Sequence, residues 1–323
     1  MNKAYFGIPI VAVSIIVLVW AFQGVQNDGL TVGVSLWISD SEYERNFDGF
    51  KTGLEEAGFV DGQNIRYIVE NPNGDKTNQL RIIQSFIDQD VDLIYTLTTP
   101  GTLVAKKLTD EIPIVFSIVT FPVEAGIIDS FENSGNNLVG TSNFVPIEKQ
   151  VSLIMQLVPV EKIGFIKRTG ELNSEIQFNQ MKDYVNQENI KISLLNSKSI
   201  DESKIILDYS IDFVDVFYQS CDTLVQSGVE EIAIEIATAH NKPTFSCNKK
   251  GIEKGALIGN VADFTNIGYI SGQKAALILQ GSSPSELNSE FQTVDNIIIN
   301  LKTAKKLGIE IPENLINSAT IIE

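Results

Sequence analysis

The sequence predicts an α/β fold with two lobes, each built on a doubly wound parallel sheet, and a transmembrane helix in front of them. Three observations support this prediction. Short apolar runs alternate with segments of helical periodicity along most of the chain, which is the pattern of a parallel sheet covered by helices. The alternation starts again near residue 142, so it describes two units of similar length. The first part of the chain contains one long run without a charged residue.

The uncharged run extends from residue 4 to residue 22, and about 20 apolar residues are enough to cross a bilayer as a helix. Lys3 precedes the run and Asp28 follows it, an order that places the N-terminus inside the cell and the rest of the chain outside. We therefore expect residues 1–29 to be a signal anchor that holds an extracytoplasmic protein at the cell membrane. A cleaved secretory signal is the alternative, although the small residues of a cleavage site are poorly represented here.

Residues 30–142 are expected to form the first lobe. The predicted strands span residues 31–37, 64–69, 91–95, 112–116 and 138–141. The predicted helices span residues 42–57 and 76–88, and two more begin near Leu103 and Glu124. Strands and helices that alternate in this way form a parallel sheet with helices on both faces.

Residues 143–262 are expected to form the second lobe in the same way. The predicted helices span residues 147–157, 174–186 and 222–239, and the predicted strands span residues 162–166, 191–195, 213–218, 243–246 and 256–259. Another helix is predicted at 265–279, before a polar, linker-like stretch. We expect about residues 263–289 to return to the first lobe and about residues 290–323 to return to the second.

The balance of charge argues against nucleic acid as a partner. The chain has 41 acidic side chains against 24 Lys and Arg, which gives a formal net charge of −17. An acidic surface repels phosphate backbones. We therefore expect no nucleic acid among the partners of this chain, which we expect to act as a monomer.

Motifs for catalysis are scarce. The single histidine, His240, lies at a predicted helix end, and the sequence contains no metal-ligand spacing, phosphate-binding loop or nucleophile elbow. We therefore expect a binding protein that is not an enzyme and needs no cofactor and no metal. A hydrolase that uses paired carboxylates stays open as an alternative, because the pairing of acids in space is invisible in a sequence.

The two cysteines each follow a predicted strand. Cys221 comes after the strand at 213–218, and Cys247 comes after the strand at 243–246. If these strands are neighbours, their carboxyl ends bring both thiols to one edge of the sheet, where they can oxidise outside the cell. A disulfide and two separately buried thiols both agree with the sequence.

A hydroxyl-rich turn follows the strand at 91–95, where Thr98 and Thr99 precede Pro100 and a helix. Ligands of doubly wound sheets bind beyond the carboxyl ends of the strands. Threonine hydroxyls and the free N–H groups of a helix N-terminus suit a carboxylate or another small anion. The alternative is that Thr98 or Thr99 only caps the helix.

Several peptides along the chain resemble those of a known family and occur in its order. They are GFVDGQNI (58–65), IPIVF (112–116), PVEAG (122–126), GNNLVG (135–140), ELNS (171–174) and NLKTAKKLGIEIP (300–312). From about residue 30 to its C-terminus the chain resembles the substrate-binding proteins of ABC transporters, and specifically their tryptophan/tyrosine-type branch. The resemblance implies a two-lobed clamshell of the type I periplasmic-binding-protein fold that closes on a small solute, often an amino acid. It also implies two partners, an ABC permease in the membrane and a separate ATPase.

The resemblance also assigns candidate ligand-binding residues. Thr99 and Pro100 match the first cleft turn of the family, which implies that this turn holds the carboxylate of the ligand, while Thr98 stands where glycine is usual. The residues that match the second-lobe turn are Glu171, Asn173 and Ser174.

Two acids, Asp222 and Asp263, match acids of the family, although Cys221 stands where the family has a threonine before the first of them. An ammonium group needs a nearby carboxylate, so both acids are candidates to bind one. Each of them can equally be only a helix cap.

The departures from the family bear on the ligand. Phe121 stands where the family has an aspartate, and Lys167 and Arg168 replace a Tyr-Asn pair before the second-lobe turn. The loss of an acid and the gain of two bases favour a ligand more anionic than a neutral amino acid. Alternatively, the two cations only balance Glu171 and Glu175 on the surface.

Aromatic residues that follow the predicted strands are a further candidate feature. They are Trp37, Tyr95, Phe121 and Phe144. These rings can form a wall around a planar group, or they can belong to the core.

Together, the residues and the resemblance predict an extracytoplasmic receptor of an ABC importer that closes on a small, carboxylate-bearing, amino-acid-like solute and delivers it to the permease. The alternative is a membrane-anchored ligand-sensing ectodomain that signals to a membrane partner. The expected mechanism is closure about the crossings between the lobes, with the open form favoured until a ligand contacts both.

Overall fold

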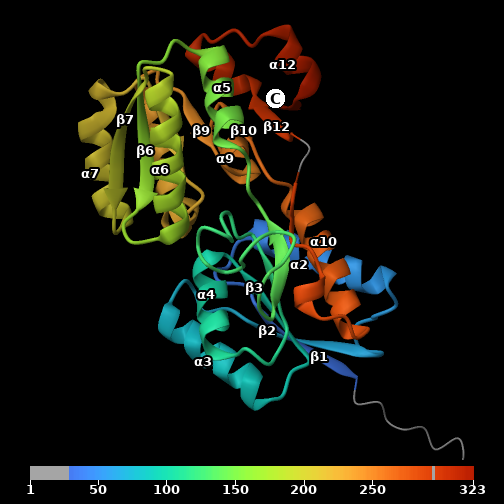
Figure 1. Cartoon of the computed structure of the whole chain (residues 1–323). Helices are drawn as coiled ribbons and strands as arrows, with labels where there is room; N and C mark the ends of the chain where they lie inside the picture. Colours follow the sequence, from blue (N-terminus) through green and yellow to red (C-terminus); the bar gives the residue numbers. More distant parts are fainter. Residues whose placement is uncertain (1–28, 293–294) are drawn as a thin grey trace, which may run out of the picture.

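The computed structural model describes residues 29–292 and 295–323. The helix expected over residues 4–22 lies outside these ranges. Within them, no helix is both long enough and apolar enough to cross a membrane. The described chain forms two lobes, each with a central sheet that is covered by helices (Figure 1).

The first lobe has a six-stranded sheet in the order β11-β5-β4-β3-β1-β2, and each pair of neighbours in it is parallel. The strands are β1 (Leu30–Ser35), β2 (Ile65–Glu70), β3 (Leu93–Leu97), β4 (Ile114–Ser117), β5 (Leu138–Ser142) and β11 (Glu290–Phe291). The helices are α2 (Ser41–Glu56), α3 (Lys76–Asp88), α4 (Thr99–Leu108) and α10 (Phe264–Leu279). Because α3 and α4 cover one face and α2 and α10 the other (Figure 1), central strands such as β3 are buried along their whole length.

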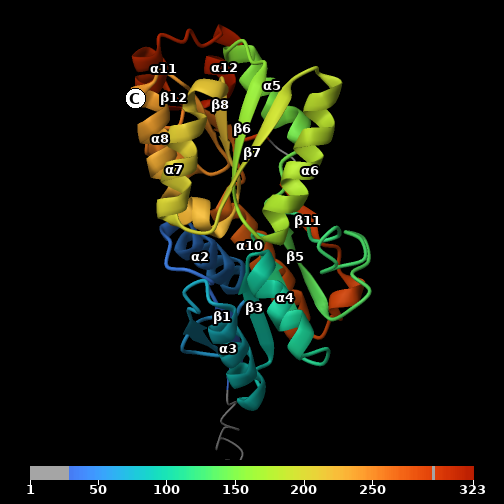
Figure 2. The same cartoon turned by 90° about the vertical axis from the view of Figure 1, so that its left-hand side faces the viewer.

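The second lobe has a seven-stranded sheet in the order β13-β12-β10-β9-β8-β6-β7. The strands are β6 (Lys162–Arg168), β7 (Lys191–Ser197), β8 (Val216–Gln219), β9 (Thr244–Ser246), β10 (Ile258–Asn260), β12 (Ile297–Asn300) and β13 (Thr320–Ile322). The helices are α5 (Ile147–Leu157), α6 (Leu172–Gln187), α7 (Ile200–Ser210), α8 (Glu230–Ala239), α9 (Lys249–Glu253), α11 (Leu301–Leu307) and α12 (Glu313–Ser318). Figure 2 shows α5 and α6 on one face of this sheet and α7 and α8 on the other.

One neighbour pair departs from the predicted parallel arrangement, because β12 runs antiparallel to β10. The chain reaches β12 directly from the first lobe, after β11, and therefore enters the second sheet from the opposite direction. Among the described elements, those of the first and second lobes follow one another three times along the chain, after β5, after β10 and after β11 (Figure 1).

Helix α10 ties the returning chain to the first lobe by packing closely on α2. Gly49 and Gly53 of α2 face Gly268 and Gly272 of α10, and a Cβ at any of these positions would collide with backbone atoms of the opposite helix. The four glycines therefore let the two backbones touch, which larger residues would prevent.

Two predicted helices differ from the structure. The segment after Phe121 forms consecutive turns instead of a helix starting near Glu124, with Ala125 N bonded to Phe121 O at 2.9 Å and Ile127 N bonded to Pro122 O at 2.8 Å. The helix expected over 222–239 begins as regular α8 only at Glu230, because Gly228 adopts a φ of 141° in the wide turn before it. Both segments follow strands that end at the cleft, so their irregular backbone belongs to the region that can meet a ligand.

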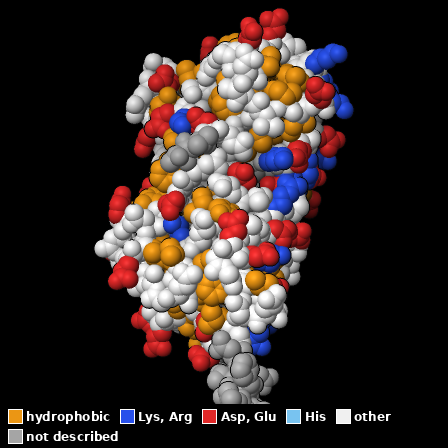
Figure 3. All heavy atoms as spheres, turned by 90° about the vertical axis from the view of Figure 1, so that its right-hand side faces the viewer, with side chains coloured by type: hydrophobic (Ala, Val, Ile, Leu, Met, Phe, Trp, Pro, Cys, Tyr) orange, Lys and Arg blue, Asp and Glu red, His pale blue; other side chains and the backbone are white. Residues whose placement is uncertain are grey.

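Charged side chains of both signs are scattered over the face in Figure 3. Asp and Glu lie on both lobes, and several Lys and Arg side chains lie toward the right-hand edge of the view with acidic side chains among them.

Candidate functional site

Three neighbouring strands of the first sheet, β1, β3 and β4, end in an unusual backbone conformation. The residue that follows each strand closely has a positive φ, which is 72° at Trp37, 69° at Thr98 and 55° at Ile118. Residues other than glycine rarely adopt this backbone conformation, because it costs on the order of 1–3 kcal/mol. Where they do adopt it, they tend to lie at ligand sites. The carboxyl edge of the first sheet is therefore the first candidate for such a site.

A cavity of about 360 Å³ lies at this edge and receives residues from both lobes. The first lobe contributes Trp37, the α3 start near Lys76, and the α4 start at Thr99 and Pro100, while residues 168–172 line it from the second lobe. A ligand in a cavity between two lobes contacts both of them only in the closed form, so its binding favours closure.

Four buried polar atoms on segments that follow strands have no hydrogen-bond partner among the described residues. Trp37 Nε1 and Thr99 Oγ1 belong to residues that line the cavity, whereas Asn143 Oδ1 and Asn173 Oδ1 belong to residues outside its lining. A fifth such atom, Gln219 Oε1, lies at the end of β8. Leaving such an atom unpaired costs about 1–3 kcal/mol, so native proteins rarely do so. The first four comprise a donor, a hydroxyl and two amide acceptors, which complement a ligand that has both acceptors and donors.

The two threonines of the first cleft turn have different surroundings. The Thr98 hydroxyl accepts a long hydrogen bond of 3.5 Å from Gly101 N, so it caps α4. The Thr99 hydroxyl is buried at the start of α4, next to Pro100, and has no partner within the described part of the chain. In this structure Thr98 caps the helix, whereas the hydroxyl of Thr99 is available for a ligand.

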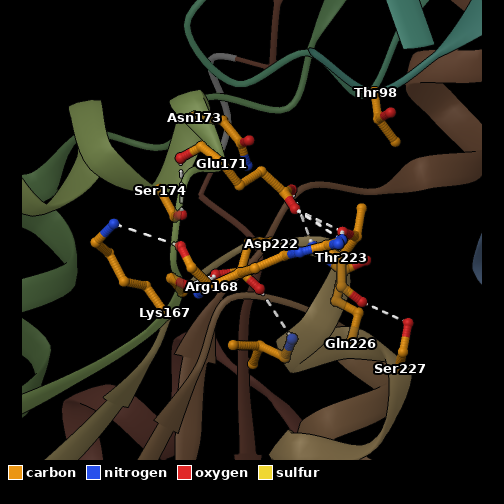
Figure 4. Close-up of polar contacts among 12 residues, drawn as sticks. Thr98, Lys167, Arg168, Glu171, Asn173, Ser174, Asp222, Thr223, Gln226 and Ser227 are labelled. Carbon is orange, nitrogen blue, oxygen red and sulfur yellow. Dashed lines mark hydrogen bonds and ion pairs between the residues drawn. The ribbon is translucent and has the colours of Figure 1, made fainter. Parts of the chain in front are cut away.

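Arg168 and Glu171 face the cavity from the second lobe and are joined through Thr223 (Figure 4). Glu171 Oε1 accepts a hydrogen bond from Thr223 N at 3.0 Å, and Oε2 accepts one from the Thr223 hydroxyl at 2.5 Å. Arg168 Nη1 donates to the same hydroxyl at 2.9 Å and lies 3.7 Å from Glu171 Oε2. The arginine charge is therefore partly balanced within its own lobe.

The Glu171 carboxyl is a weak acid in this environment. Burial, and then the charge of Asp222, raise the pKa of Glu171 to about 7. Near neutral pH this carboxyl therefore changes its charge beside the cavity.

Asp222 supports the site instead of offering free oxygens to it. Its carboxylate accepts hydrogen bonds from Arg168 N at 2.5 Å, Val225 N at 2.8 Å and Ser220 Oγ at 2.9 Å. Burial raises the pKa of Asp222 despite these bonds. An acid with this many protein donors acts as a cap of the chain after β8, which was the alternative to ammonium binding.

The remaining polar candidates also differ in whether they have a polar atom available for a ligand. Asn173 donates to Cys221 O at 2.7 Å, which leaves its Oδ1 as the unpaired atom named above. Ser174 donates to Glu171 O at 3.2 Å inside the first turn of α6. Asp263 is exposed, caps α10 through Asn266 N at 3.1 Å, and is absent from the cavity lining.

Some of the predicted cations and aromatic rings line the cavity, and others do not. Lys167 is buried and pairs with Glu175 at 2.5 Å, so of the two cations only Arg168 lines the cavity. Tyr95 stacks on Phe50 in the core, with ring centroids 3.8 Å apart, and takes no part in a wall.

Phe121 and Phe144 contact each other edge to face, with centroids 5.7 Å apart, where β4 and β5 end. Trp37 is the aromatic side chain of the four that lines the cavity.

Asn143 was not among the site residues predicted from the sequence. It directly follows β5 at the first passage between the lobes, and its side chain is buried. The signal that points to it is its position, because a polar side chain directly after a central strand lies at the ligand edge of the sheet.

The two cysteines form a disulfide with Cα atoms 5.7 Å apart, which decides between the two alternatives left by the sequence. The bond is possible because β8 and β9 are parallel neighbours and each cysteine follows one of them closely.

The lobes also touch each other directly. Lys250 Nζ lies 2.5 Å from Asp40 Oδ2, and the Tyr43 hydroxyl donates to Gln226 Oε1 at 3.0 Å. Both contacts join α2 or its cap to the second lobe, so the structure represents a closed arrangement.

A larger hollow of about 650 Å³ lies between β7 and α7, away from this cleft. Apolar side chains such as Ile205, Tyr209 and Phe213 line it, and all its lining residues belong to the second lobe. Closure of the lobes would therefore not change the shape of this hollow, whereas the smaller cavity lies between them.

Comparison with known proteins assigns the family. The model of the family described as ABC transporter substrate binding protein matches residues 31–322. The chain belongs to this family. Substrate-binding proteins of this kind are receptors for small molecules outside the cytoplasm, and they are not enzymes, which confirms those expectations.

Individual relatives of this substrate-binding protein support the family assignment. The tyrosine-binding protein of Clostridioides difficile (strain R20291) is 31% identical over 280 residues, which are 86% of this chain and 81% of that protein. The structure of an ABC domain from Streptococcus pneumoniae in complex with L-Trp has a TM-score of 0.86 at 24% identity, over 91% of this chain and all of that one (100%).

The ligand-free, open structure of a substrate-binding protein with adhesive properties from Clostridium difficile has a lower TM-score of 0.72 at 29% identity, over 91% of this chain and 99% of that one. The higher similarity to the complex than to the open form agrees with the direct contacts between the lobes.

Proposed function

We propose that this substrate-binding protein is the extracytoplasmic receptor of an ABC importer for an aromatic amino acid. It acts as a monomer, anchored to the cell membrane by residues 4–22, closes on the ligand about the three passages between its lobes, and delivers it to a permease driven by a separate ATPase. The observation that carries the proposal is a cavity shared by both lobes, where two of the lining residues, Trp37 and Thr99, have buried polar atoms without a hydrogen-bond partner among the described residues.

The first lobe suits the carboxylate of an amino acid. The Thr99 hydroxyl, at the start of α4, and the Trp37 indole N–H are hydrogen-bond donors without protein acceptors among the described residues. Donors at a helix N-terminus bind an anion through both hydrogen bonds and the helix dipole.

The amide oxygens of Asn143 and Asn173 suit the ammonium group, because each is an acceptor without a donor in the described structure. Arg168 is already engaged by Thr223 and Glu171, so it does not require a ligand with an additional negative charge. We therefore propose an amino acid with a neutral side chain, and the names of the two relatives above support an aromatic one.

Thermal melting with amino acids and matched analogues tests the ligand. L-tyrosine, L-tryptophan and L-phenylalanine are compared with tyramine, which lacks the carboxylate, and with 3-(4-hydroxyphenyl)propanoic acid, which lacks the ammonium group. We expect at least one of the amino acids to raise the melting temperature in a concentration-dependent way, since it binds only the folded state. Both analogues should bind at least about tenfold more weakly, because each lacks a charged hydrogen-bonding group. A failure of all three amino acids, or equal binding of tyramine, would contradict the proposal.

Uptake measurements test the importer role. Cells should accumulate labelled ligand only when this protein and its permease are both present. A ligand-sensing ectodomain would leave uptake unchanged when it is deleted, so this result would favour the alternative.

A further inference from the structure

Residues 220–223, called the β8 turn here, support the second-lobe half of the cleft (Figure 4). The carbonyl of Cys221 accepts the hydrogen bond from Asn173 Nδ2, and this bond directs the unpaired Oδ1 of the same amide. Thr223 holds Glu171 through its backbone N–H and its hydroxyl. The position of the turn therefore sets the positions of side chains that face a ligand.

The β8 turn also contains a buried acid. Asp222 accepts the N–H of Arg168 and contributes to the raised pKa of Glu171. The two carboxyl groups are held by hydrogen bonds that all involve the β8 turn, so a displaced turn would leave them without these donors.

The disulfide restrains the turn, because it ties Cys221 to Cys247, behind the neighbouring strand β9. The residue after Cys247 is Asn248, whose side chain accepts Gly251 N at 2.8 Å and caps α9. Lys250 of this helix makes the ion pair to the first lobe. The covalent bond thus connects the turn that holds ligand-facing side chains to the helix that contacts the other lobe.

We propose that the Cys221–Cys247 disulfide is a positioning element of the binding site, which holds Asn173 and its neighbours in the ligand-binding geometry so that affinity depends on the oxidation state of this bond. The inference rests on the proposed function for the identity of the ligand but not for the behaviour of the turn. A phosphine reductant provides the comparison: it gives two electrons to the disulfide, water supplies two protons and one oxygen, and the products are two thiols and a phosphine oxide.

Hydrogen exchange tests the turn without any ligand. The full-length chain, kept in detergent, is compared before and after phosphine treatment. We expect the amides of Arg168 and Thr223, which are bonded to Asp222 and Glu171, to exchange at least about tenfold faster after reduction. The amide of Phe217 inside β8, bonded to Pro243 O, should keep its rate. Unchanged rates at Arg168 and Thr223 overturn the inference, and so does equal acceleration at Phe217, which would make the disulfide a general stabiliser.

Calorimetric titration with L-tyrosine tests the effect on affinity. We expect reduction to weaken binding about tenfold, and the double variant Cys221→Ser/Cys247→Ser to show the same loss. The double variant also controls for the reagent, because phosphine should not change its affinity.

A double-mutant cycle asks whether the disulfide acts through Asn173. Asn173→Ala weakens binding in the oxidised protein, and removal of the disulfide should add less than its separate effect when the amide is already absent. Full additivity, or an unchanged affinity after reduction, overturns the inference. If the oxidised wild-type protein binds no aromatic amino acid, the proposed function fails, and hydrogen exchange alone decides the role of the disulfide.

Discussion

Lys250 of the second lobe and Asp40 of the first lobe form an ion pair across the gap between the lobes, with 2.5 Å between Nζ and Oδ2. The Asp40 side chain is 5% exposed and the Lys250 side chain 27% exposed, so the pair is partly shielded from water. Asp40 also caps α2 by accepting Glu42 N at 2.8 Å. The contact exists only while the lobes are closed, and it therefore adds to the free energy of closure.

Replacing Lys250 by Ala should shift the protein toward the open form and weaken ligand binding. A partly buried pair of this kind contributes about 1–2 kcal/mol, which corresponds to roughly a 5- to 30-fold change in affinity. Small-angle scattering at a ligand concentration that half-saturates the wild-type protein should show a larger radius of gyration for the variant. The matched control is Lys254→Ala, because the ion pair of Lys254 is with Glu231 of the same lobe. Equal behaviour of the two variants would contradict a role of the ion pair in closure.

Thr99→Ala and Thr98→Ala should have opposite profiles. Loss of the Thr99 hydroxyl removes a hydrogen bond to a charged ligand group, which costs about 1.5–3 kcal/mol, so affinity should fall at least about tenfold with little change in melting temperature. Loss of the Thr98 hydroxyl removes a long cap bond and should cost about 0.5 kcal/mol of stability with affinity retained. Titration and melting of both variants separate the roles, and unchanged affinity of Thr99→Ala would remove this residue from the site.

Asn143 should select for the ammonium group. Asn143→Ala should weaken the binding of an aromatic amino acid about tenfold, whereas Asn143→Asp should retain or strengthen it because a carboxylate bonds an ammonium more strongly. Asn143→Ala and Asn143→Asp should bind the analogue without an ammonium group with equal affinity. A loss with Ala that is equal for both ligands would indicate a structural role instead.

Glu171 should make the stability of the protein fall as pH rises toward neutrality. Its pKa is raised from 4.5 to about 7 in the folded state, so between these values the folded protein binds more protons than the unfolded chain. The contribution of this group to the free energy of unfolding therefore decreases with rising pH through this window and is lowest above pH 7, by up to about 3 kcal/mol.

Glu171→Gln removes this titration, and urea unfolding from pH 5 to pH 8 measures the consequence. Relative to the wild-type protein, the variant should gain stability as pH rises. Glu230, whose pKa burial also raises to about 7, stays in both proteins and cancels in the difference. Parallel stability curves would show that Glu171 does not titrate in this window.

The N-terminal segment should stay attached after export. The native protein should sediment with membranes and keep its full mass, because residues 4–22 carry enough apolar surface to hold it there. Mass spectrometry of the exported protein checks this prediction. A mature N-terminus between residues 22 and 30 would establish a cleaved signal.

The local pattern of the sequence was sufficient for most elements of the fold. Strand β3 and helix α3 were expected within a few residues of their observed bounds, because burial of a strand and of one helix face leaves a periodic pattern in the sequence itself. The expected helix near Glu124 failed, since its apolar residues pack in turns and not on one helix face. The family pattern also pointed to Thr99, Glu171 and Asn173, which stay predictions of the ligand-binding site.

What only the tertiary structure decided is which of these polar side chains remain available. The carboxylate of Asp222 is bonded by Arg168, which lies 54 residues away in the sequence, while Asn143 keeps an unpaired oxygen that no local pattern marks. The pairing of Cys221 with Cys247 likewise depends on β8 and β9 being neighbours. Sequence periodicity reports how each segment meets the core, whereas a hydrogen bond or a disulfide depends on distances between segments, and these are set only when the chain has folded.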